Sequence, residues 1–193
     1  MKKFKLTSEF IVDISGVKLF RIKALIEFGN VKAGDLGGYI EKEENLSHMG
    51  NAWVSGNAQV SGDARVSGNA RVSGNARVFG DARVSGNARV SGDARVFGDA
   101  RVSGNAQVFG DARVSGDARV SGDKDYAYAH GFGSCNRTTT FFRLKDGDVG
   151  VRCGCFYGTL AQFRDNVCET HGETKKAQEY LMLADLMDFR FKN

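Results

Sequence analysis

Six side chains in the C-terminal third of the sequence are of the types that bind zinc. They are Cys135, Cys153, Cys155, Cys168, His130 and His171. Residues two apart in a strand share a face, so Cys153 and Cys155 could point at one metal ion. Structural zinc sites use wider cysteine spacing on turns, however, and the sequence offers no second close pair. We therefore expect no metal and no cofactor, and reduced thiols packed against the strand.

Hydroxyl groups and an arginine gather in the same part of the sequence. Arg137, Thr138 and Thr139 follow one another and could together hold an anion or a phosphate group. The same run also suits a turn followed by an exposed strand face. We keep these three residues as a possible anion or ligand site.

These residues follow a region that repeats every six positions. Twelve valines occur at this spacing from Val54 to Val120, and most units read Ser/Phe-Gly-Asn/Asp-Ala-Arg/Gln-Val. This period differs from that of a helix and from the alternation of a strand. It is typical of a parallel β-helix whose coils have three sides. We predict a left-handed parallel β-helix with Val, Ala and Gly inside and Gly-Asn or Gly-Asp pairs at the corners.

Residues eighteen apart should stack along such a rod at about 4.8 Å. Stacking produces three columns rich in arginine: Arg65, Arg83, Arg101 and Arg119; Gln59, Arg77, Arg95 and Arg113; Trp53, Arg71, Arg89 and Gln107. An aspartate column precedes the first of them by two residues: Asp63, Asp81, Asp99 and Asp117. We expect these carboxylates to neutralise the arginines, and stacked asparagines to form amide ladders.

Two aromatic residues interrupt the serine positions of the repeat. Phe79 and Phe97 are eighteen residues apart and should stack on one face, flanked by Arg77 and Arg95. Trp53 should point outward from the first coil. An exposed aromatic stack beside arginines is typical of a partner-binding surface, although terminal segments could equally fold over it.

Histidine is missing from the repeat between Trp53 and Tyr128. Acyl transfer on a hexapeptide β-helix uses a histidine base, and only His48 or His130, beyond the ends of the rod, could supply one. We expect the protein not to be an enzyme, and keep a hexapeptide acyltransferase-like enzyme as an alternative.

The flanking sequences predict two caps. Residues 1–50 read as short strands that form an N-terminal β capping segment, residues 51–123 form the β-helix, and residues 124–193 form an α+β unit with two strands and two helices. We expect strands at 138–144 and 149–156, a helix from the N-cap Thr159 to 171, and another over 173–189. Tyr180, Leu183 and Met187 form an apolar helix face, which we predict to mediate self-association or partner binding.

The overall charge excludes some classes of protein. The chain has 27 Lys and Arg against 23 Asp and Glu in 193 residues, so it lacks the strong positive charge of a typical nucleic-acid-binding protein. It has no apolar stretch of membrane-spanning length and no signal-peptide pattern. We expect a location in the cytoplasm of a bacterial host cell, without membrane contact.

Several segments resemble one known family. The sequence is similar to hexapeptide-repeat, polymer-forming cytoskeletal-like proteins of bacteriophages and prophages. The similar segments are Gly34-Asp35-Leu36-Gly37-Gly38-Tyr39-Ile40 through Ser47, the Gly-Asn-Ala-x-Val repeats, and the tail from Cys153 to Leu160 and from Glu169 to Gly172. The resemblance implies the fold and a phage context but no established activity.

We therefore expect a non-enzymatic interaction protein. Its partner would be a host protein or ribonucleoprotein that it binds and inhibits, such as a CRISPR effector of a defence system. We also expect a homo-oligomer formed through the C-terminal domain. The alternative is a structural β-helical scaffold that self-assembles.

Overall fold

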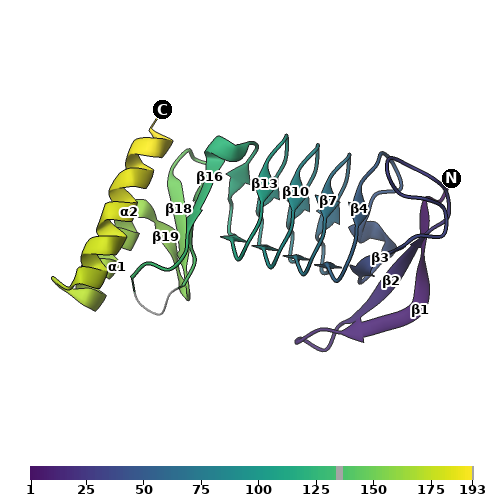
Figure 1. The fold of residues 1–193 in the computed structure, drawn as a ribbon, viewed down its shortest axis with the longest axis horizontal. Coiled ribbons are helices and arrows are strands. Elements are labelled where there is room, and N and C mark those ends of the chain that lie inside the picture. The colour runs from purple at the N-terminus through teal and green to yellow at the C-terminus, as the bar shows by residue number, and fades with distance from the viewer. Residues whose placement is uncertain (134–136, 193) are drawn as a thin grey trace.

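The protein is a rod with a cap at each end, seen in a computed structural model that describes residues 1–133 and 137–192 (Figure 1). The rod is a solenoid of two-residue strands, each formed by an outward residue and an inward valine. The strands are β4 (Trp53–Val54), β5 (Gln59–Val60), β6 (Arg65–Val66), β7 (Arg71–Val72), β8 (Arg77–Val78), β9 (Arg83–Val84), β10 (Arg89–Val90), β11 (Arg95–Val96), β12 (Arg101–Val102), β13 (Gln107–Val108), β14 (Arg113–Val114) and β15 (Arg119–Val120).

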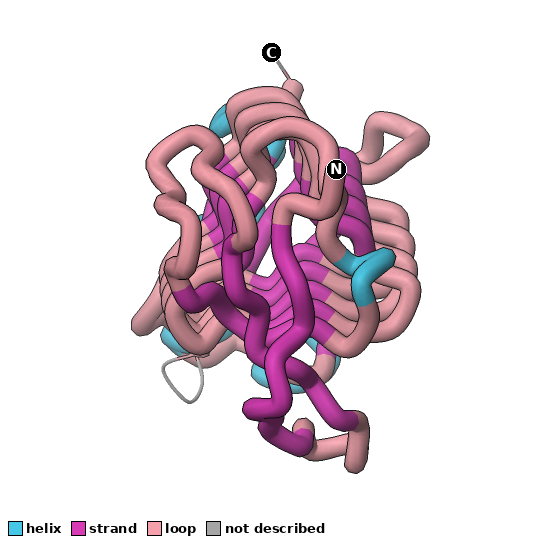
Figure 2. The backbone as a smooth tube through the Cα atoms, turned by 90° about the vertical axis from the view of Figure 1, so that its right-hand side faces the viewer, coloured by secondary structure: helices cyan, strands magenta, loops and turns pink. Residues whose placement is uncertain are grey.

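These strands form the three faces of the rod, and the layers lie in register when the rod is seen from its end (Figure 2). We call β5, β8, β11 and β14 the hairpin face, β6, β9, β12 and β15 the arginine face, and β4, β7, β10 and β13 the third face. All pairing is parallel between residues eighteen apart, as when Arg95 lies between Arg77 and Arg113. The predicted mainly-β solenoid with three-sided coils is therefore confirmed.

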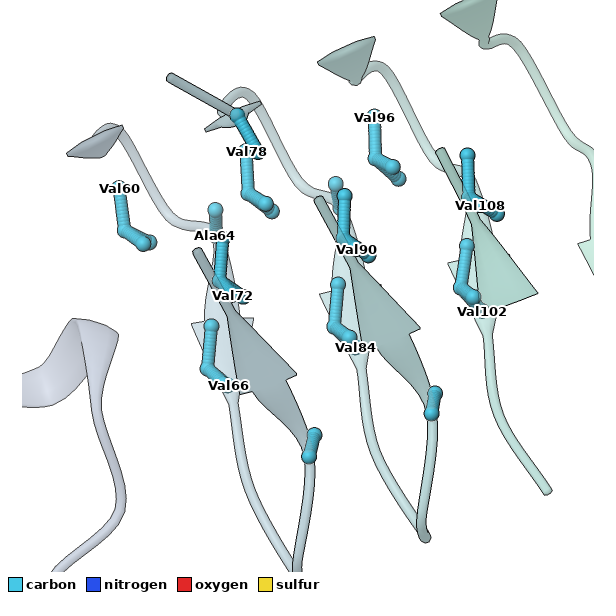
Figure 3. Packing of buried hydrophobic residues seen from close by; sticks show 14 of the residues in the cluster. Val60, Ala64, Val66, Val72, Val78, Val84, Val90, Val96, Val102 and Val108 are labelled. Carbon is cyan, nitrogen blue, oxygen red and sulfur yellow. The ribbon is translucent and has the colours of Figure 1, made fainter. Parts of the chain in front are cut away.

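The core of the rod consists of valine and alanine (Figure 3). Every repeat valine and alanine from Ala58 to Val114 is completely buried. The expectation that glycine also lines the bore is wrong, because the repeat glycines occupy the corners with φ between 58° and 72°. A Cβ on Gly86 would lie 2.9 Å from the backbone nitrogen of Gly104, so the corner needs both the conformation and the small size of glycine.

The N-terminal cap continues directly into the rod. A hairpin of β1 (Phe4–Val12) and β2 (Lys18–Ala24) precedes β3 (Leu36–Ile40), which is antiparallel to β2 and parallel to β5. The pairing of Tyr39 with Gln59 and of Leu46 with Val66 places one more layer before residue 51. A single seven-stranded sheet therefore runs from the hairpin to the far end of the hairpin face.

Polar side chains seal the N-terminal end of the bore. The Nζ atom of the buried Lys3 donates to the carbonyl of Ala52 at 2.8 Å and lies 4.6 Å from the ring centroid of Phe28. Asn45, in the short helix η1 (Glu43–Asn45), donates to the carbonyls of Gly62 and Ala64. These bonds satisfy carbonyls that would otherwise be left open at the edge of the first layer.

Trp53 is the clearest departure from the predicted surface. Its side chain points away from the bore, as expected, but it is only 7% exposed. The ring of Phe28 packs edge-on against it with a centroid distance of 5.4 Å. The N-terminal cap therefore covers the first position of the third-face column.

The C-terminal unit contains more strands than the sequence predicts. After η2 (Asp123–Asp125) come β16 (Tyr126–Ala129), β17 (Thr139–Arg143), β18 (Val149–Cys153) and β19 (Phe156–Thr159), which form an antiparallel sheet in chain order. The predicted strand over 149–156 is divided at Gly154, whose φ is 60°. Helices α1 (Leu160–His171) and α2 (Lys175–Phe191) follow, and Thr159 caps α1 as predicted.

This sheet separates two hydrophobic cores. Phe142 and Leu144 belong to the core of the rod, whereas Phe141 and Val151 pack with the two helices. The hydroxyl of Thr140 accepts a hydrogen bond from the backbone of Arg113 at 3.0 Å and so attaches the sheet to the last coil. Neither α1 nor α2 has the length and apolar character needed to cross a lipid bilayer.

Candidate binding surface

The hairpin face carries a column of three cations between two raised walls. Arg77, Arg95 and Arg113 follow one another along β8, β11 and β14 in parallel register. The turn after β1 borders this column at one end, and the C-terminal unit borders it at the other. We call the surface around these three arginines the trough.

The guanidinium groups of the trough lack carboxylate partners. Among the described residues no ion pair involves Arg77, Arg95 or Arg113, and the one side-chain contact is a long 3.5 Å bond from Arg113 to the carbonyl of Gly154. Burial lowers the pKa of the Arg95 guanidinium, and the positive charges of Arg113 and Arg77 lower it further. The carboxylate of Asp93 acts in the opposite direction and raises this pKa. The three guanidinium groups can donate charge-assisted hydrogen bonds to a negatively charged ligand.

The predicted aromatic stack is present beside this column. The rings of Phe79 and Phe97 lie parallel, with centroids 4.9 Å apart and an interplanar angle of 2°. Phe79 is 36% exposed, whereas the guanidinium of Arg152 on β18 lies 5.4 Å from the ring centroid of Phe97. The stack is therefore open towards the hairpin and covered at its C-terminal end.

Two hollows occur along the trough, and Arg95 lines both. One, of about 360 Å³, lies between the β1–β2 turn and the ring of Phe79, with Ile14 and Val17 in its wall. The other, of about 620 Å³, lies between Arg113 and the segment that contains His130 and Arg137. Aspartates 93 and 111 also line the second hollow and partly offset its positive charge.

The predicted anion site divides into two parts. Arg137 and Thr138 line the second hollow, where the Oγ1 atom of Thr138 lies 2.9 Å from Nδ1 of His130. Thr139 is only 1% exposed, and its hydroxyl donates to Sγ of Cys153 inside the sheet. The prediction is thus wrong for Thr139, because adjacent residues of a strand point to opposite sides.

The arginine face does not pair with its own aspartate column. The one salt bridge of that column within the described part of the chain joins Asp63 to Lys42 at 2.7 Å. Arg119 donates to backbone carbonyls instead, including that of Asp117 at 3.0 Å. The predicted neutralisation is therefore wrong, because strand and corner residues two positions apart point in different directions.

The predicted amide ladder does form. Asn69, Asn87 and Asn105 are linked by side-chain hydrogen bonds of 3.1 and 3.0 Å, each between residues eighteen apart. The bonds run along the rod axis and join successive layers at one corner. The asparagine column is therefore used for the structure of the rod.

The thiols and imidazoles of the described residues lie apart from one another. Within residues 1–133 and 137–192, three or more potential metal ligands do not come together anywhere. Cys153 is half-buried and lies 3.8 Å from the hydroxyl of Tyr180, whereas Cys155 and Cys168 are exposed. Cys135 lies outside the described residues. His48 stacks on Phe4 with a centroid distance of 4.3 Å, which is a packing role.

The predicted contact face of the second helix faces inward. Tyr180 and Met187 are 3% and 7% exposed within the core of the C-terminal unit, and Leu183 packs partly against it. The expectation that this face contacts a partner is wrong for Tyr180 and Met187, because α1 and the sheet already cover them. The exposed apolar side chains of α2 are Met182, Leu186 and Phe189.

Two further contributors to the trough were missed. Arg152 covers the end of the aromatic stack, and Ile14 stands 90% exposed at the hairpin turn. Both are far from the repeat in sequence. The sequence offers one signal for each of them. Arg152 is a charged residue in an apolar strand, and Ile14 is an apolar residue in a turn.

The repeat region matches one known type of repeat. The family model described as "YdcK Beta solenoid repeat" matches residues 58–72, 70–83, 82–96, 94–109 and 106–122. The central region is a β-solenoid repeat. Each matched segment covers more than two of the six-residue units, so the family divides the β-solenoid into longer repeats than the valine spacing indicates. No curated protein matches the chain.

Proposed function

We propose that this β-solenoid protein is a non-enzymatic binding protein that holds an acidic surface of its partner in the trough. The observation that carries the proposal is the column of Arg77, Arg95 and Arg113 without carboxylate partners, next to the exposed ring of Phe79. Arginine and aromatic residues dominate the energetics of many protein interfaces. All coils of the rod are alike, so a partner that contacted only the coils could shift along the rod by one layer. The two walls at the ends of the trough prevent this shift.

The proposed biological setting comes from the sequence resemblance to phage and prophage proteins. In this setting the protein acts in the cytoplasm of the bacterial host and inhibits a host protein or ribonucleoprotein, such as a CRISPR effector. A ribonucleoprotein suits the trough because phosphate groups pair well with arginine.

The test is affinity capture from a bacterial host lysate with two matched double variants. Arg77→Glu with Arg95→Glu reverses the charge of the trough, whereas Arg71→Glu with Arg89→Glu makes the same change on the third face. We expect the captured host factor to be lost with the first variant and retained with the second. Capture by both variants alike would exclude the trough, and ribonuclease treatment distinguishes a protein from a ribonucleoprotein partner.

A self-assembling scaffold remains the second candidate. The amide ladder and the continuous parallel pairing favour it, because they make the rod a stiff spacer. Both ends of the rod are covered, however, so a scaffold would have to assemble through its sides rather than by stacking end to end. An acyltransferase-like enzyme would require turnover of acetyl-CoA, which a direct assay tests.

A further inference from the structure

We propose that two copies of the chain associate side by side through their arginine faces, with their rods parallel. The proposal goes beyond partner binding in the trough, which lies on a different face. It rests on two oppositely charged columns: the arginines of the arginine face and the aspartates of the corner that precedes this face. Their central members are Asp81, Asp99, Arg83 and Arg101.

The side chains of these four residues are exposed and unpaired. In the described part of the chain, none of them makes a side-chain hydrogen bond or ion pair. The ends of the columns differ. Asp63 is held by Lys42, Asp117 accepts from Tyr157 at 3.4 Å, and Arg119 is bonded to carbonyls. The central coils therefore carry the charges available for a partner.

The spacing of these charges selects the partner. Successive members of each column are one coil apart, about 4.8 Å, whereas side chains on one face of an extended peptide recur at about 6.8 Å. A peptide strand would fall out of register with the column after two residues. A second copy of the rod has the same spacing and carries both signs of charge, so it can match every layer.

Charge complementarity also fixes the orientation of the two rods. A two-fold axis in the interface perpendicular to the rods would place aspartates opposite aspartates. A two-fold axis parallel to the rods places Asp81 of each copy opposite Arg83 of the other, and Asp99 opposite Arg101. Closed two-fold pairs of this kind are the commonest symmetric assemblies. The parallel arrangement brings both C-terminal units to the same end.

The contact should be weak and sensitive to salt. A face four layers long is small for a stable interface, and exposed ion pairs each contribute little. Sedimentation velocity at increasing protein concentration should show a dimer at low ionic strength. Raising the salt to about 0.5 M should weaken association roughly tenfold or more, because screening acts directly on exposed pairs.

Charge exchange provides the decisive test. Either of two double variants should abolish the dimer. One is Asp81→Arg with Asp99→Arg, and the other is Arg83→Asp with Arg101→Asp. An equimolar mixture of the two variants should restore it as a heterodimer, because at these four positions one copy then carries only arginines and the other only aspartates. Arg71→Asp with Arg89→Asp on the third face is the matched control and should leave the dimer intact.

Three outcomes would overturn the proposal: a wild-type chain that stays monomeric at low salt, a dimer that survives either charge exchange, or a mixture that does not associate. Circular dichroism of each variant checks folding. If a charge-exchange variant does not fold, Asp81→Asn with Asp99→Asn removes the same negative charges with almost no change in side-chain shape. This variant should still weaken the dimer, and an unchanged dimer would overturn the proposal.

Discussion

The rod and the C-terminal unit reach a buried core by opposite means. The rod uses two small residues, valine and alanine, and repeats one contact in every layer. The C-terminal unit uses large side chains that each occur once, such as Phe163 against Tyr180 with ring centroids 5.6 Å apart. Stability in the rod is therefore spread over equivalent layers, whereas stability in the C-terminal unit depends on individual rings.

A buried charge in the rod should have the largest effect. Replacing Val84 with Asp puts an unpaired carboxylate into the bore and should lower the free energy of unfolding by roughly 3–5 kcal/mol. Gln107→Asp makes the same charge change at an exposed position of the third face and should change stability by less than about 1 kcal/mol. Thermal and denaturant unfolding measure both variants. Equal stability of the two would show that Val84 is not inside.

Two neighbouring phenylalanines test where the regions meet. Phe141→Ala and Phe142→Ala should each cost about 3–5 kcal/mol, since both rings are completely buried. The damage should appear in different places, because Phe141 packs with the helices and Phe142 with the rod. Hydrogen exchange should show lost protection in α1 and α2 for the first variant and in β14 and β15 for the second. The same pattern in both would mean that the two cores are one.

The N-terminal end of the rod should make stability depend on pH through Lys3. Burial lowers the pKa of Lys3 from 10.5 to about 8, so the folded chain loses this proton at a lower pH than the unfolded chain. The unfolded state then binds more protons between these values, and stability should rise with pH across this window by about 2–3 kcal/mol. Lys3→Met should remove the rise, whereas Lys5→Met, at an exposed position, should keep it. A rise that persists in Lys3→Met would assign it to other groups.

The same contrast explains what the sequence could predict. The valine spacing determined the coils, the stacking of Phe79 on Phe97 and the asparagine ladder, because each depends only on residues eighteen apart. Pairing of the aspartate and arginine columns was mispredicted because it depends on side-chain direction at a corner, which periodicity does not describe. Burial of Trp53, Tyr180 and Thr139 was missed since it depends on which element covers them.

The walls of the trough were unpredictable for a related reason. Ile14 and Arg152 reach the hairpin face through the placement of the caps, and their distance along the chain leaves no repeating signal. A contact between the repeat and a segment that occurs once does not recur along the sequence. The sequence therefore predicts the two segments separately but not the contact between them.

Because the chain turns a corner after every six residues, the number of six-residue units determines how the two ends of the rod are rotated relative to each other. Each unit turns the chain onto the next of three faces, so the unit count fixes the rotational phase between the hairpin and the C-terminal sheet. Removing eighteen residues would shorten the rod by one layer of about 4.8 Å and keep both walls of the trough above the same face. Removing six would swing the C-terminal wall onto a neighbouring face and separate the two hollows that now share Arg95. Relatives that preserve the trough should therefore differ in length by whole coils.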